Sequence, residues 1–258
     1  MGSYRKNKLG TAWEITRKIE NWPTAWGLRL FRKRAGLRLL KLRNGLQLVC
    51  RGNSRDWDVF HELFFAGGYE SALRYLANQS GAPKVLDLGG NIGLFALLAA
   101  RSHPLPNIFS YEPGPPNARL FEVNRLLNPE LMDRIALSQS AAGAQDRVAE
   151  WYFDEKNPGG SGFFAGGNHR FPVTVHAFDR IVESFANPLD LVKMDIEGAE
   201  YEIFFKSSLQ TWQKIQAMAL ELHEDPQGLI PRERCLEAIR RLGFQVKEES
   251  VISLFLHR

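Results

Sequence analysis

From residue 83 onward, short apolar runs typical of buried β-strands alternate with segments of helical pattern. Repeated strand–helix units form a mainly parallel sheet with helices on both faces. We expect parallel strands at 84–88, 107–112, 134–140, 189–194 and 217–222, added strands at 149–153 and 173–176, and a final antiparallel pair at 244–248 and 251–256. Ligands of such sheets bind beyond the carboxyl ends of the strands, so the side chains there are the candidates for function.

The N-terminal part of the chain differs from the rest in charge. Residues 1–51 hold 13 of the 33 lysines and arginines but few of the acidic residues, only Glu14 and Glu20. The alternation of apolar and polar residues on either side of Asn44-Gly45 predicts a β-hairpin with a tight turn. We therefore expect a basic N-terminal extension with helices and a hairpin over residues 1–55, followed by a main domain over residues 56–258.

This extension mixes its basic residues with aromatic ones, including Trp13, Trp22 and Trp26. Such a surface suits an anionic partner, which would be a membrane surface or a nucleic acid. It equally suits a cap whose aromatic rings pack inward on the main domain while the charges face water. No recognised nucleic-acid-binding motif accompanies the basic residues, which disfavours a nucleic-acid partner.

The sequence offers no sign of export or of a membrane span. No apolar run approaches the ~20 residues that cross a bilayer, and no apolar signal core follows the basic N-terminus. Cys50 and Cys235 lie far apart, without the paired spacing of a zinc site or a disulfide framework. A cytoplasmic location is expected, with peripheral attachment to a membrane as a further option.

The first strand of the main domain leads into a glycine-rich turn that contains Asp87, Gly89, Asn91 and Gly93. Glycines at this position let the backbone turn sharply and approach a ligand closely. Their spacing differs from the Gly-x-Gly-x-x-Gly of dinucleotide-binding sites, and Asp87 would repel a pyrophosphate. An NAD-dependent enzyme is therefore an alternative rather than the preferred interpretation.

Ionisable side chains follow the next strands at the same edge of the sheet. Glu112 comes 19 residues after Gly93, the distance at which such folds present an acid to ribose hydroxyls. Asp195 follows the strand at 189–194, and the next strand ends in Glu221 and His223, whose alternation places both on one face. His223 suits a general base, because a histidine is partly neutral near physiological pH. A hydrogen-bonded surface imidazole is the alternative.

A glycine-rich stretch at 157–170 lies between the two added strands. Its glycines would make it mobile, and Phe163 and Phe164 give it apolar groups with which to cover a substrate. A lid that excludes water from the reaction and a simple surface loop are both consistent with this pattern.

Taken together, these motifs resemble those of the FkbM-type methyltransferases. The resemblance rests on an Asp-x-Gly-x-Asn-x-Gly turn at 87–93, a Tyr-Glu-Pro strand end at 111–113 and a Lys-x-Asp-x-Glu-Gly-x-Glu block at 193–200. It covers roughly residues 60–225. It implies the Rossmann-like α/β fold of class I S-adenosylmethionine-dependent methyltransferases, with methyl transfer most often to hydroxyls of sugars or polyketide-like natural products.

The resemblance also implies a binding site for S-adenosylmethionine. The residues so implied are Asp87, Gly89, Asn91 and Gly93 around the methionine end, Glu112 at the ribose, Ser140, Ala141 and Ala142 at the adenine, and Asp195 as a further contact. The predicted function is O-methylation of a hydroxyl on a sugar, glycolipid or natural product, whether a small molecule or a lipid-linked sugar. A non-catalytic protein that binds through its basic arm is a second alternative.

The chemistry of such a transfer requires a base or a metal, because a neutral hydroxyl is a poor nucleophile. Asp195, Glu221 and His223 are the candidate catalytic residues. We favour metal-free base catalysis. In the metal-dependent alternative, Asp195 and Glu221 would bind Mg²⁺ through their carboxylate oxygens.

Overall fold

The computed structural model describes residues 8–30, 35–154, 161–163, 169–250 and 253–258. Most of the stretch at 157–170 that sequence analysis interpreted as a lid or a surface loop lies outside these residues, as do residues 1–7 of the basic extension. Among the described residues, no helix is long and apolar enough to cross a bilayer.

A seven-stranded sheet forms the centre of the main domain, in the order β11-β12-β10-β9-β3-β4-β5. Its strands are β3 (Lys84–Leu88), β4 (Asn107–Tyr111), β5 (Ile135–Ser138), β9 (Leu189–Met194), β10 (Ile215–Leu220), β11 (Gln245–Glu249) and β12 (Leu254–His257). The strands from β5 to β10 are parallel, and β12 runs antiparallel to both β10 and β11. This is the strand order of class I methyltransferases, so the predicted fold, with its C-terminal antiparallel pair, is confirmed.

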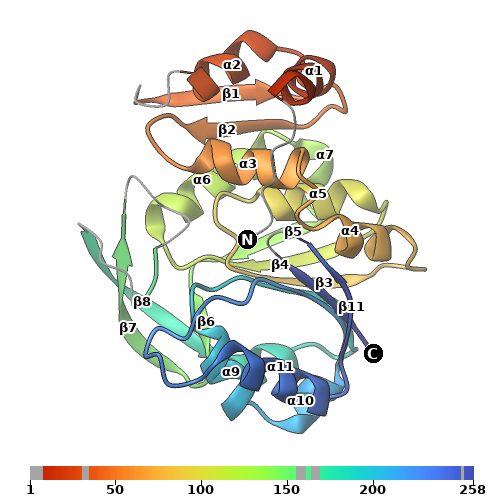
Figure 1. The fold of residues 1–258 in the computed structure, drawn as a ribbon, viewed down its shortest axis with the longest axis vertical. Coiled ribbons are helices and arrows are strands. Elements are labelled where there is room, and N and C mark those ends of the chain that lie inside the picture. The colour runs from red at the N-terminus through yellow and green to blue at the C-terminus, as the bar shows by residue number, and fades with distance from the viewer. Residues whose placement is uncertain (1–7, 31–34, 155–160, 164–168, 251–252) are drawn as a thin grey trace.

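Helices cover both faces of this sheet (Figure 1). One face carries α4 (Glu70–Ala77), α5 (Leu94–Ser102), α6 (Pro115–Leu126) and α7 (Pro129–Met132), and the other carries α8 (Phe178–Glu183), α9 (Glu200–Lys206), α10 (Leu209–Gln213) and α11 (Arg232–Arg241). Two apolar clusters fill the two interfaces. The central strands β3, β9 and β10 are buried along nearly their whole length because both of their faces are covered.

The N-terminal region forms α1 (Lys8–Lys18), α2 (Trp22–Leu30) and the predicted hairpin of β1 (Leu37–Lys41) and β2 (Gln47–Arg51). Two asparagines bind the free edge of β2, Asn124 of α6 and Asn128 immediately before α7. Asn124 accepts from the Val49 amide at 2.6 Å, and Asn128 accepts from the Gln47 amide at 2.9 Å and donates to the Gln47 carbonyl at 2.6 Å. These contacts fasten the hairpin to the main domain, which it joins through α3 (Asp56–Phe64).

A second, three-stranded sheet lies beside the main one (Figure 1). It consists of β6 (Ala141–Gly143), β7 (Arg147–Phe153) and β8 (His169–Ala177), with β7 and β8 antiparallel. The two added strands predicted from the sequence correspond to β7 and β8. Sequence analysis did not anticipate β6, whose three small residues carry no strand pattern.

Candidate active site

A cavity of about 340 Å³ opens at the carboxyl ends of β3, β4, β9 and β10. Its walls come from the glycine turn, the residues that follow these strands, the second sheet and α3. Of the residues predicted for the site, those that line this cavity are Gly89, Asn91, Glu112, Ala141, Ala142, Asp195, Glu221 and His223. This cavity therefore lies at the carboxyl ends of the strands, where the sequence analysis expected a ligand to bind.

The glycine turn has little room for any side chain. Gly89 has a φ of +83°, and a Cβ there would lie 1.8 Å from the Asp195 carbonyl oxygen. The amides of Gly89 and Gly90 both donate to the Tyr111 carbonyl, at 3.0 and 2.9 Å. The turn is thus fixed between β4 and the segment after β9, and only glycine fits at position 89.

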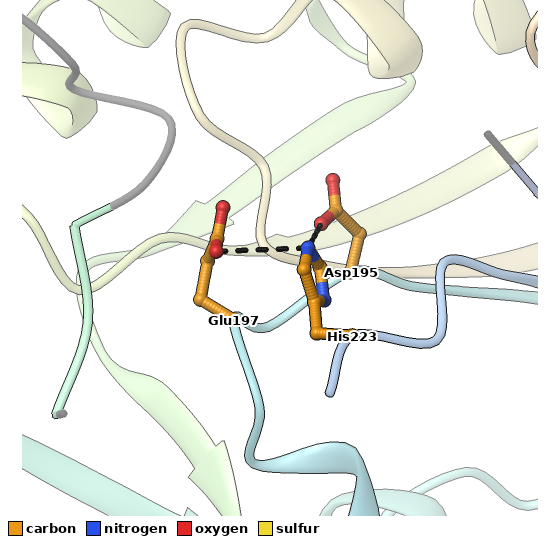
Figure 2. A group of neighbouring side chains, drawn as sticks. All are labelled: Asp195, Glu197 and His223. Atoms are coloured by element: carbon orange, nitrogen blue, oxygen red, sulfur yellow. Dashed lines mark ion pairs between the residues drawn. The ribbon is translucent and has the colours of Figure 1, made fainter. Parts of the chain in front are cut away.

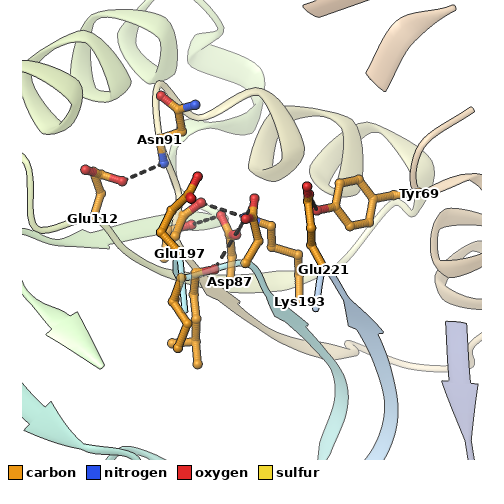
Figure 3. Close-up of polar contacts among 12 residues, drawn as sticks. Tyr69, Asp87, Asn91, Glu112, Lys193, Glu197 and Glu221 are labelled. Atoms are coloured by element: carbon orange, nitrogen blue, oxygen red, sulfur yellow. Dashed lines mark hydrogen bonds and ion pairs between the residues drawn. The ribbon is translucent and has the colours of Figure 1, made fainter. Parts of the chain in front are cut away.

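Glu112 lies at the floor of one end of the cavity and is only 4% exposed. Its carboxylate accepts a hydrogen bond from the Asn91 amide at 2.8 Å (Figure 3). It also accepts from the Gly114 amide at 2.8 Å and from the side chain of Asn117 at 3.3 Å. Burial outweighs these bonds and raises the pKa of Glu112 to about 7. The side-chain oxygen of Asn91, also in the cavity wall, is buried without a partner among the described residues. Both side chains can accept hydrogen bonds from a ligand.

Asp87 lies behind the turn and does not line the cavity, unlike the direct contact expected from the sequence. It pairs across the sheet with Lys193, whose ammonium lies 3.5 Å from Asp87, 3.2 Å from Asp195 and 2.6 Å from the Gly89 carbonyl. Burial disfavours the charged lysine, but the two carboxylates outweigh this and raise the pKa of Lys193. Asp87 therefore supports the turn through Lys193.

Two further predicted contacts also lie outside the cavity wall. Gly93 precedes α5 with a φ of +85° and packs against the ring of Phe121. Ser140 is buried, and its hydroxyl lies 2.7 Å from that of Ser138. Both are structural neighbours of the cavity, since Gly93 faces Phe121 and Ser140 faces Ser138.

The opposite end of the cavity holds a histidine surrounded by carboxylates (Figure 2). Nε2 of His223 lies 3.8 Å from Asp195, 3.6 Å from Glu197 and 3.8 Å from Glu221. Its Nδ1 lies 2.9 Å from Glu200, which is completely buried. Burial lowers the pKa of His223, but the hydrogen bond to Glu200 and the surrounding negative charges outweigh this and raise it to about 10. At neutral pH this imidazole is a cation, so it is a poor base.

The neighbouring carboxyl groups are better proton acceptors. Burial raises the pKa of Glu197 to about 7, and burial together with the charge of Asp195 raises that of Glu221 to about 8. The hydroxyl of Tyr69 lies 3.5 Å from Glu221 (Figure 3). One oxygen or nitrogen each from Asp195, Glu197 and His223 lie within 4.8 Å of one another, so they could also hold a metal ion if His223 lost its proton.

Several cavity residues had no signal in the sequence. Tyr69 and Glu62 approach from the region of α3, and burial and the charge of Asp195 raise the pKa of Glu62. Trp151 and Phe163 approach from the second sheet and the segment after it. All four residues lie outside the motifs described above. Of the four, only Phe163 belongs to a segment that the sequence had indicated, the glycine-rich stretch at 157–170.

Comparison with known proteins shows a family for this chain. A family model described as "Methyltransferase FkbM domain" matches residues 81–246. Methyltransferase sdnD of Sordaria araneosa is 23% identical over 223 residues, which are 74% of this chain and 83% of that protein. Methyltransferase 1 of Beauveria bassiana is 25% identical over 187 residues, 64% of this chain and 73% of that protein. Among solved structures, the methyltransferase FkbM of Methylobacillus flagellatus is 15% identical, with a TM-score of 0.47 over 79% of this chain and 54% of that one.

The strand order and the glycine turn at its switch point define a class I methyltransferase. The family match covers well over half of the chain, so the chain belongs to the FkbM methyltransferase family. Membership implies S-adenosylmethionine as the methyl donor and a small molecule as the substrate. The two alternatives considered from the sequence, an NAD-dependent enzyme and a non-catalytic binding protein, are set aside.

Proposed function

We propose that this protein transfers a methyl group from S-adenosylmethionine to a hydroxyl of a sugar, glycolipid or natural-product acceptor. The observation that carries the proposal is the chemical difference between the two ends of one cavity. One end has a glycine turn and a buried carboxylate, Glu112, and the other has ionisable groups around His223. A donor and an acceptor held at these two ends would meet between them.

The donor end fits the cofactor on three observations. Gly89 lines the cavity with backbone atoms, Glu112 can accept from ribose hydroxyls, and the oxygen of Asn91 is a buried acceptor without a partner among the described residues. Ala141 and Ala142 add a small apolar wall for an adenine ring. When bound, S-adenosylmethionine supplies a methyl group on a positively charged sulfur. We assign Asp87, Gly93 and Ser140 supporting roles behind this surface.

At the acceptor end, we assign the base to Glu221. Its carboxylate would accept the proton of the acceptor hydroxyl, since its pKa near 8 is matched to that task. His223 remains protonated and offsets the negative charge that Asp195, Glu197 and Glu221 bring together. Asp195, held by Lys193, would orient the acceptor beside the glycine turn.

We favour this metal-free route over Mg²⁺ bound by Asp195 and Glu221. The protonated ring of His223 already places a positive charge between the same carboxylates. A metal would have to displace that proton or avoid the ring, and Mg²⁺ prefers oxygen to imidazole ligands. If the enzyme does use a metal, the ligands would be Asp195, Glu197 and His223, in place of the pair Asp195 and Glu221.

The negative charge of this end favours an acceptor whose reacting part is neutral, such as a polyol. A lipid-linked sugar meets this requirement, and peripheral contact with a membrane would bring it close. The proposed contact surface lies on the extension, residues 1–55, where Trp13 is 66% and Trp22 42% exposed among basic residues. Buried Ile15 and Ile19 of the same segment pack in the core, which supports the capping role as well.

Calorimetric titration with S-adenosylhomocysteine tests the proposal, with NAD as the control ligand. We expect binding of the first ligand only, and about tenfold or greater weakening in Glu112→Gln, which loses a charged acceptor. Sugar and natural-product alcohols are then screened by mass spectrometry for a gained methyl group. Failure of S-adenosylhomocysteine to bind would overturn the donor assignment, and methylation of amines alone would overturn the acceptor assignment.

A further inference from the structure

Two tryptophans carry a buried indole N–H that has no hydrogen-bond partner among the described residues, Trp151 and Trp212. A buried donor left unpaired costs about 1–3 kcal/mol, so such groups are rare and call for an explanation. Trp212 lies inside the apolar core, stacked on Phe204 at 4.9 Å, and does not line the cavity. Trp151 is 6% exposed and forms part of the cavity wall.

The position of Trp151 is fixed from several sides. It belongs to β7, where it pairs with Phe171 of β8. The ring of Phe163 meets it edge-on, with centroids 4.9 Å apart. The guanidinium of Arg147 lies over Phe163 and forms an ion pair of 3.0 Å with Glu202 on α9. The indole is therefore held in place by the second sheet and by its link to the main domain.

The indole nitrogen adjoins the same space as Glu112. A Cβ added to Gly114 would lie 2.9 Å from Oε1 of Glu112 and 3.4 Å from Nε1 of Trp151. The carboxylate can only accept hydrogen bonds, whereas the indole can only donate. An acceptor and a donor are thus placed together in the cavity wall, each able to serve a ligand.

We infer that Trp151 is a specificity-determining residue of the cofactor site, whose N–H donates to a ribose hydroxyl that Glu112 holds. A ribose hydroxyl that donates its hydrogen to a carboxylate still has free lone pairs, and a neighbouring N–H satisfies them. The second sheet would in this way contribute a contact to the donor. The inference rests on the proposed function, because it presumes that Glu112 holds the ribose.

The test compares Trp151→Phe with Trp212→Phe by calorimetric titration of S-adenosylhomocysteine. Both variants keep an aromatic ring and lose a buried N–H without a partner, but only one lies in the cavity. We expect Trp151→Phe to bind about 2- to 13-fold more weakly, as for loss of one hydrogen bond, and Trp212→Phe to bind as the unchanged protein does. Equal affinity of the two variants would overturn the inference.

Ligand analogues locate the contact. The loss of affinity caused by Trp151→Phe should disappear with either the 2′-deoxy or the 3′-deoxy form of S-adenosylhomocysteine. The analogue that lacks the contacted hydroxyl cannot accept the bond from the Trp151 N–H, so the substitution has nothing further to remove. A penalty that persists with both analogues would show that the N–H does not contact the ribose. If the unchanged protein bound no S-adenosylhomocysteine, the proposed function itself would fail, which is a different outcome.

A measurement on the unchanged protein covers the case in which Trp151→Phe does not fold. In a ¹⁵N spectrum, the chain has six indole N–H signals. Saturating S-adenosylhomocysteine should shift the assigned Trp151 signal downfield and slow its exchange with water, while the Trp212 signal stays in place. An unmoved Trp151 signal would contradict the inference.

Discussion

The buried carboxylate of Glu200 fixes the ring of His223, with Oε1 2.9 Å from Nδ1. The same carboxylate accepts from the amides of Ile196 at 3.0 Å and Gly198 at 2.7 Å. A single side chain thus joins the segment after β9 to the residue that follows β10. It sets both the orientation and the charge of the ring at the acceptor end.

Replacement of Glu200 by Gln should lower the pKa of His223 from about 10 toward its ordinary value, because the largest stabilising contact of the imidazolium is lost. An NMR titration of the histidine Cε1–H signals measures this directly, and the other five histidines provide the internal reference. A His223 signal that titrates as before would show that Glu200 does not control its charge.

Glu221→Gln should reduce kcat by about 10²–10⁴-fold, the usual contribution of a general base. In the unchanged enzyme, kcat/KM should rise with pH and level off above about 8, since the carboxyl group of Glu221 must lose its proton before it can accept another. The variant should lack this rise. Initial rates between pH 6 and 10 test it, with Glu237→Gln, on the exposed surface of α11, as the control. A pH rise that survives in Glu221→Gln would move the base elsewhere.

Exhaustive treatment with EDTA should leave the methyl transfer rate unchanged, and added Mg²⁺ or Mn²⁺ should not increase it. The reason is the imidazolium of His223, which already balances the charge of the nearby carboxylates. Rates before and after metal removal, with metal content checked by mass spectrometry, decide the point. Activity lost with the metal and restored by its return would instead assign Asp195, Glu197 and His223 as metal ligands.

Asn124→Ala should lower the free energy of unfolding by about 2–3 kcal/mol, since buried backbone groups would lose their partners. Its side chain is bonded to both the amide and the carbonyl of Val49 and to the carbonyl of Ile92. Urea denaturation gives the value. Asn78→Ala serves as the matched control, because Asn78 is exposed and its side chain donates to Arg74 of its own helix. Equal stability of the two variants would mean that the bonds of Asn124 do not hold the hairpin in place.

The sequence predicted the parallel strands well because β3, β4, β9 and β10 are short, largely buried runs, each followed by a glycine or an acidic residue. It also indicated that Gly89 and Glu112 would lie close together, since each directly follows a strand, and both line the cavity. In a parallel sheet, residues in that position meet at one edge whatever the details of packing.

The acceptor end was predictable only in part. Asp195, Glu221 and His223 follow neighbouring strands, so the sequence indicated that they would lie close together. The charge of His223 depends on its contact with the buried side chain of Glu200, which the sequence does not reveal. Tyr69 and Trp151 come from segments whose local pattern says nothing about a cavity. Tertiary contacts between distant segments determine such positions, and a single sequence does not record them.

Residues of α3 and Tyr69 line the cavity on the side of Glu221. They belong to none of the motifs that we assign to the methyl donor. Asp56 of α3 must stay, because it holds Arg51, which bonds Asn117 beside Glu112. Val59 and Glu62 of the same helix line the cavity and belong to no motif. We expect exchange of these two residues between relatives to change which acceptor is methylated, while the sequence of the glycine turn stays the same.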